Sequence, residues 1–151
     1  MKTASDLGMT ESEYSSLLKV RDMLANGLIA HAESNDQAGN TFDMDVSCDR
    51  HSCGTLMCIG GWVKVLDMNL PTDSNGVFII SEEQELEIGN YVSSQTGPLE
   101  SLYFPSDGVV HWSRIGPVEA AKAIDNVLQH GDPDWPEAAP KAARGYVDEE
   151  F

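Results

Sequence analysis

The chain has 151 residues, of which 41% are hydrophobic and 23% are charged, so it can bury a core and does not have the composition of a disordered polyelectrolyte. Its 25 acidic and nine basic residues give a formal net charge of −16. Such a surface repels DNA, RNA and anionic membranes, and nine bases are too few to neutralise a nucleic-acid backbone. The composition therefore argues against direct nucleic-acid binding and favours basic proteins as partners.

The sequence contains no apolar run long enough to span a bilayer. The first six residues have no apolar segment after Lys2, so we expect no signal peptide. Three cysteines cannot all pair within one chain, and without an export signal we expect reduced thiols and a cytoplasmic protein.

The first predicted helix begins after Thr10, which forms a capping box with Glu13, and extends to about Ala32. Apolar residues at helical spacing predict its buried face; these are Tyr14, Leu17, Leu18, Met23 or Leu24, Leu28 and Ile29. Residues 42–46 alternate between apolar and polar and predict a short extended piece. A second, apolar helix is expected from near Cys53 to near Asp67, with Cys58 in its middle.

Residues 77–80 and 109–112 each predict a short strand. A second capping box, at Ser81 and Gln84, opens a helix to about Ser94, and the clearest helix extends from Pro117 to His130. Prolines in the tail from about residue 132 exclude a long helix there. We therefore expect a mainly α fold of about four helices with a minor two-stranded β ribbon, in one domain over residues 1–151.

Acidic residues dominate the middle of the chain, because no Lys or Arg occurs between Lys64 and Arg114. A solvated helix face would explain any single acid there. The length of the stretch also suggests an acidic patch that faces a basic surface on a partner. The residues predicted to bind the partner are Glu82, Glu83, Glu85, Glu87 and Glu100.

All three cysteines fall within eleven residues, and this window allows three interpretations. The first is a zinc site built from Cys48, His51, Cys53 and Cys58, which are ligands of the type that zinc prefers. The spacing fits poorly, because a single residue between His51 and Cys53 leaves little room for both to face one ion. We therefore expect no metal and no cofactor, with zinc as the alternative.

The second interpretation is a cysteine nucleophile at Cys53, where a helix N-terminus would favour the thiolate. His111 could act as its base, and Asp125 or Asn126 could orient that base. In order and spacing this resembles papain-type hydrolases. The third interpretation is structural: Cys58 packs as a small buried hydrophobe, and Gly60 and Gly61 let another element approach closely.

One pattern of residues resembles a set of small proteins from bacteriophages, plasmids and actinobacteria that share Cys-Gly-Thr-x-x-Cys-Ile-x-Gly. Here the pattern covers residues 53–61, and weaker similarity extends from Phe42 to Ala121. The resemblance implies a mobile-element origin and a mainly helical domain. No activity is known for the set, so no function carries over from it.

Together these features predict a non-enzymatic acidic protein that occupies a basic surface of a partner. If a phage encodes it, the partner could be a host nucleic-acid-binding complex in the host cytoplasm, which the protein would inhibit by nucleic-acid mimicry, in the manner of anti-restriction or anti-CRISPR proteins. The alternative is a small zinc-binding or thiol-dependent protein that uses residues 48–58.

Overall fold

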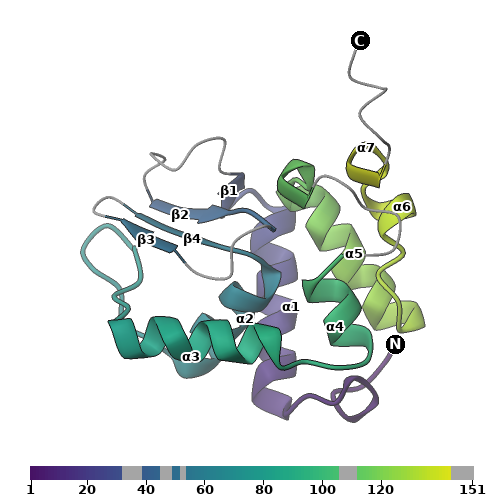
Figure 1. Cartoon of the computed structure of the whole chain (residues 1–151), viewed down its shortest axis with the longest axis horizontal. Coiled ribbons are helices and arrows are strands. Elements are labelled where there is room, and N and C mark those ends of the chain that lie inside the picture. Colours follow the sequence, from purple (N-terminus) through teal and green to yellow (C-terminus); the bar gives the residue numbers. More distant parts are fainter. Residues whose placement is uncertain (32–38, 45–48, 52–53, 106–111, 144–151) are drawn as a thin grey trace.

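The computed structural model describes residues 1–31, 39–44, 49–51, 54–105 and 112–143, and for residues 39, 49–51, 54–56, 113, 141 and 143 it describes the backbone alone. The fold is mainly α with a small sheet, which confirms the predicted class (Figure 1). The strands are β1 (Ala30–His31), β2 (Gly39–Phe42), β3 (Asp49–His51) and β4 (Gly54–Met57). The helices are α1 (Glu11–Ala25), α2 (Ile59–Met68), α3 (Glu82–Ser93), α4 (Pro98–Tyr103), α5 (Pro117–His130), α6 (Trp135–Ala138) and α7 (Pro140–Ala143), with short 3₁₀ helices at Ser5–Leu7 and Trp112–Arg114.

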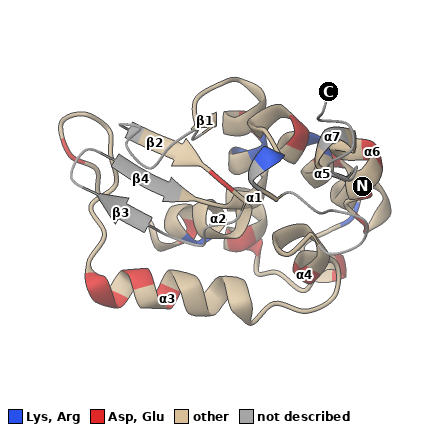
Figure 2. Ribbon diagram, turned by 45° about the horizontal axis from the view of Figure 1, so that its top comes forward, with Lys and Arg blue, Asp and Glu red and all other residues tan. Residues whose placement is uncertain are grey.

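Helix α1 stands at the centre of the molecule and packs against α2 and α5 (Figure 1). The sheet lies on one side of it, and α5, α6 and α7 lie on the other. Helix α3 packs on α2 and follows one edge of the molecule in both ribbon views (Figures 1 and 2). Apolar side chains from α1, α2, α4 and α5 meet in a core that includes the buried Leu17, Trp62, Leu102 and Ile124.

The sheet has four short strands in the order β1-β2-β4-β3, where a two-stranded ribbon was expected. Strands β1, β2 and β4 are parallel, and β3 pairs antiparallel with β4. Residues 77–80 form no strand, because this segment makes only a bridge between Thr72 and Phe78 around a turn in which Asp73 accepts hydrogen bonds from the N–H groups of Asn75 and Val77. Of the other predicted strand, at 109–112, residues 109–111 lie outside the described residues, and Trp112 belongs to the 3₁₀ helix Trp112–Arg114.

Helix α1 begins at the predicted capping box but ends at Ala25, seven residues before the predicted end. Gly27, at φ 74°, turns the chain out of the helix, and Ala30–His31 then pairs with Thr41 and Phe42 of β2. Leu28 is consequently 69% exposed, whereas Ile29 is fully buried. Strand pairing thus replaces the last two turns of the predicted helix.

Helix α2 begins at Ile59, so the prediction of a helix from near Cys53 was wrong. Residues 54–57 instead form β4, which pairs with β2 on one side and β3 on the other. Cys58 therefore caps the N-terminus of α2 and does not lie in its middle. A strand bonded on both sides satisfies its backbone groups as completely as a helix does, and here its partners are β2 and β3.

Helices α3 and α5 confirm their predicted boundaries. The side chain of Ser81 accepts from the N–H of Gln84, and the side chain of Gln84 accepts from the N–H of Ser81. Helix α5 has Pro117 at its first position and ends at Gly131, whose φ of 81° is left-handed. Its residues Ala121, Ile124, Val127 and Leu128 are buried in the core, whereas Val118 is 68% exposed. Pro140 directly follows the four-residue helix α6, and the described part of the tail contains no long helix, as expected.

Candidate functional site

The acidic residues of α3 lie mainly on its solvent side. Glu82, Glu83 and Glu87 are exposed and Glu85 is half-buried. The opposite side of α3 buries Ile88, Tyr91 and Val92 in the core. Acidic residues cover the first half of the helix in Figure 2, and α3 carries no Lys or Arg. The structure therefore places the four glutamates predicted at 82–87 on one helix, with three of them turned to water.

The fifth predicted residue, Glu100, is exposed but lies on α4. The glutamates at 82, 83 and 85 occupy the first turn of α3, whereas α4 follows its C-terminal end (Figure 1). Glu100 therefore does not share a helix face with the other four. Of the five glutamates predicted to bind a partner, four therefore lie on α3 and one lies on α4.

A large apolar residue, Leu86, stands on the same outer side of α3 and is 69% exposed. It follows Glu82 by four positions and Glu83 by three, so the three side chains are neighbours on the helix surface. Leu86 was not among the residues predicted to bind a partner. The helical spacing of the sequence could have indicated its exposure, because Leu86 is out of phase with Ile88, Tyr91 and Val92, which form the buried side.

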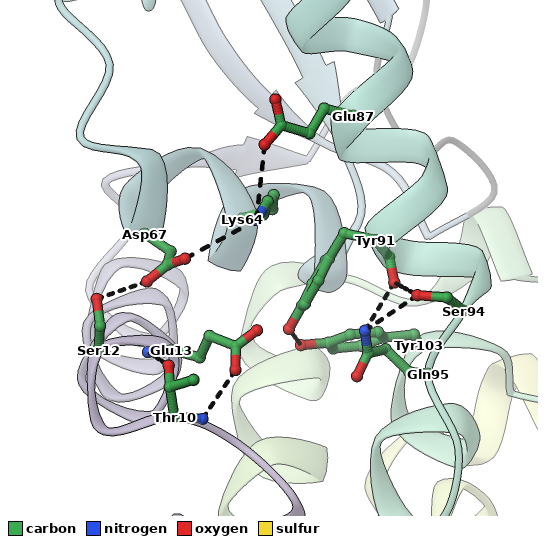
Figure 3. A network of polar contacts seen from close by, with 10 residues as sticks. All are labelled: Thr10, Ser12, Glu13, Lys64, Asp67, Glu87, Tyr91, Ser94, Gln95 and Tyr103. Carbon is green, nitrogen blue, oxygen red and sulfur yellow. Dashed lines mark hydrogen bonds and ion pairs between the residues drawn. The ribbon is translucent and has the colours of Figure 1, made fainter.

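Lys64 of α2 links the acidic helix to the rest of the fold (Figure 3). Its Nζ lies 4.0 Å from Oε2 of Glu87 on α3 and 3.9 Å from Oδ2 of Asp67 on its own helix. The same Nζ is 5.4 Å from the centre of the Tyr91 ring, within the range of a cation–π contact. Oδ1 of Asp67 accepts a hydrogen bond of 2.5 Å from the hydroxyl of Ser12, which extends the network to α1.

Two tyrosines join α3 to α4 beneath this network. Their hydroxyl oxygens, from Tyr91 and Tyr103, are 2.8 Å apart and buried. Burial is the main cause that raises the pKa of both phenols. Gly60 of α2 makes this packing possible, because a Cβ there would lie 2.9 Å from Cδ2 of Tyr103 and 3.0 Å from Cγ2 of Val92. The close approach predicted for the two glycines of α2 is therefore confirmed at Gly60.

In the cysteine window, the structure describes the side chain of Cys58. Its Sγ, 3.5 Å from the N–H of Gly61, accepts a hydrogen bond as the N-cap of α2. Burial raises the pKa of the Cys58 thiol to about 11, although the backbone N–H groups at the helix start act to lower it. Desolvation thus outweighs the helix terminus, and Cys58 is the buried residue that was predicted.

Cys48 and Cys53 lie outside the described residues, and of His51 the structure describes only the backbone, in β3. The four-ligand zinc site therefore stays the alternative to the predicted absence of a metal, and the described residues do not test either. Among the side chains that are described, no group of three or more His, Cys, Asp or Glu residues could hold a metal ion.

A thiolate at Cys53 would be favoured by a helix that starts there, but the helix starts at Ile59. His111, the candidate base, lies outside the described residues. Both candidates for its orientation have other contacts: Asp125 pairs with Arg21 at 3.2 Å, and the amide of Asn126 donates to the carbonyl of Pro133 and to Glu137. These contacts hold α5 to α1 and α6.

Within the part of the chain that the structure describes, no helix has both the length and the apolar character needed to cross a membrane. No protein-family model, no curated protein and no solved structure matches the chain. The main candidate for a functional surface is the acidic side of α3, together with the polar network around Lys64 that supports it.

Proposed function

We propose that the protein is a non-enzymatic binding protein whose acidic α3 occupies a basic surface on a partner protein. The observation that supports this most directly is the exposure of Glu82, Glu83 and Glu87 on a helix without a base of its own. The positive end of the helix dipole stabilises acids in the first turn, so this charge does not destabilise the helix that presents it. Complementary charge would speed association with a basic partner.

The partner class that we propose is a protein whose basic surface otherwise binds nucleic acid. The protein would then act as an inhibitor by nucleic-acid mimicry, and the resemblance to phage and plasmid proteins suggests a host defence complex as the target. The net charge of −16 supports this choice, because an excess of acids over bases is the charge property shared with a nucleic acid.

A competition experiment tests the proposal. The wild-type chain and a Glu82→Gln, Glu83→Gln variant are immobilised and exposed to bacterial lysate, and the retained proteins are identified by mass spectrometry. We expect a protein that the wild type retains, that duplex DNA displaces, and that the variant retains less. Retention should also weaken from about 0.1 M to about 1 M salt, as the Debye length falls from about 10 Å to about 3 Å.

A matched control removes two negative charges elsewhere. Glu11→Gln with Asp22→Asn changes two exposed acids of α1 and leaves α3 intact. This control should retain the partner as the wild type does. Equal loss in the two variants would mean that overall charge, and not α3, holds the partner. Proteins that DNA fails to displace would contradict mimicry. A separate Glu100→Gln variant tests whether α4 contributes.

A further inference from the structure

Helix α3 packs mainly on α2, whereas α1, at the centre of the fold, packs on both α2 and α5. Three of the 12 residues of α3 are buried, a fraction close to the four of 15 in α1 and below the six of 14 in α5 and the six of ten in α2. Helix α3 follows an edge of the molecule and is joined to the rest by loops at both ends (Figure 1). Elements with few buried apolar contacts open locally at a lower free energy than the whole chain unfolds.

Lys64 is a polar link between this helix and α2. It reaches Glu87 and the Tyr91 ring on α3 while it also contacts Asp67 on α2 (Figure 3). The Lys64 side chain is 19% exposed, so water screens its charge less than it screens a surface lysine. Asp67 is held from the other side by Ser12 of α1, which fixes the position of Lys64 relative to the centre of the fold.

We propose that α3 opens from α2 as a unit, and that the contacts of Lys64 set how much of the time it is closed. The opening is a property of the fold and does not depend on the proposed partner. One consequence rests on the proposed function: if the closed helix is the form that docks, the apparent affinity falls in proportion to the closed fraction. Lys64 would then regulate docking without touching the partner.

Hydrogen exchange of the purified chain, read by mass spectrometry, tests the opening. Amides of 82–93 should exchange faster than those of 117–130 in the wild type. Lys64→Met should raise the exchange rates of 82–93 by about threefold, the size expected of a partly exposed ion pair. Amides of 117–130 that exchange through global unfolding should accelerate by up to the same factor, because the lost contact stabilises the closed native state relative to both the open and the unfolded forms. The control Lys122→Met removes the 2.7 Å pair between Lys122 and Glu137, and it should leave 82–93 unchanged. Lys64→Arg should restore wild-type exchange.

Equal exchange of 82–93 and 117–130 in the wild type would overturn the proposal, because both helices would then open only by global unfolding. Unchanged exchange of 82–93 in Lys64→Met would also overturn it. If Lys64→Met does not fold, Glu87→Gln removes the contact from the α3 side, where the Glu87 side chain is 57% exposed and tolerant of change. It should again accelerate 82–93. No partner enters these measurements, so their failure is distinct from failure of the proposed docking.

Discussion

Single residues show how opposing effects are resolved in this fold. Gly60 lowers helix propensity in α2, yet it is the residue that lets Tyr103 and Val92 approach the helix. Cys58 lies at a helix N-terminus, which favours a thiolate, yet burial keeps it a thiol. In both cases packing outweighs the local preference, and each case leads to a measurable outcome.

Gly60→Ala should destabilise the protein by about 1–3 kcal/mol, because the new methyl group would overlap buried side chains that cannot move freely. The higher helix propensity of alanine, about 1 kcal/mol, offsets only part of this cost. Gly89→Ala in α3 is the matched control, since a Cβ there meets nothing within 4 Å, and it should stabilise by about 0.5–1 kcal/mol. Urea unfolding measures both; stabilisation by Gly60→Ala would show that the core can relax around it.

The Cys58 thiol should make stability depend on pH above 9. Its folded pKa of about 11 exceeds the ordinary value of 9.0, so the unfolded chain loses this proton first as pH rises. The stabilisation is complete below pH 9 and is lost between pH 9 and 11, by about 1.4 kcal/mol per pH unit. The buried tyrosines should add to the loss above pH 10.

Cys58→Ser isolates this contribution. Serine keeps an N-cap acceptor for the N–H of Gly61 and does not titrate in this range. Unfolding free energies measured from pH 8 to pH 10 should therefore fall less steeply in the variant than in the wild type. Identical slopes would mean that Cys58 does not titrate on unfolding as proposed. Cys58 had been expected in the middle of a helix, where serine would be costly; its place as N-cap makes serine the conservative change.

At the scale of elements, local signals located the long helices well. The capping boxes at Thr10 and Ser81 begin α1 and α3 as predicted, and Pro117 and Gly131 bound α5. These signals act within one turn of the chain, so the sequence contains them completely. The predicted start of α2 and the predicted end of α1 were wrong, because both depend on strand pairing, with β2 in each case and also with β3 for residues 54–57.

Ser81→Ala tests the cap of α3. The loss of the acceptor for the N–H of Gln84 should destabilise the protein by about 1 kcal/mol, and thermal unfolding measures the change. Ser81→Asp should retain most of the stability, because its carboxylate can accept the same bond. Ser93→Ala at the exposed far end of α3 should change stability by less than about 0.5 kcal/mol. Comparable losses from Ser81→Ala and Ser93→Ala would argue against a specific role for the cap.

Across the whole molecule, 25 acidic residues outnumber nine basic ones, so ion pairs cannot neutralise all of the carboxylates. Arg21, Lys64 and Lys122 each pair with carboxylates, so several of the nine bases already offset acids within the fold. The remaining acids repel one another across a compact surface. Self-repulsion of this kind destabilises the folded state and is reduced by salt.

Stability should therefore rise as the salt concentration increases from about 0.01 M to about 0.1 M, over which the Debye length falls from about 30 Å to about 10 Å. Melting temperatures at constant pH measure the effect. Glu82→Gln with Glu83→Gln removes two negative charges and should flatten the response. A melting temperature that falls over this range would show that attractive pairs dominate the electrostatics of the fold.

The mainly α class, the starts of α1 and α3, both ends of α5 and the excess of acids could be predicted from the sequence, because caps, prolines, glycines and composition act locally or by sum. Four features depend on tertiary contacts: residues 54–57 form a strand, Cys58 caps α2, Glu87 pairs with Lys64, and Glu100 lies apart from the α3 acids. Each of these depends on a partner brought near by folding, and hydrophobic period alone cannot distinguish a strand paired on both sides from a buried helix.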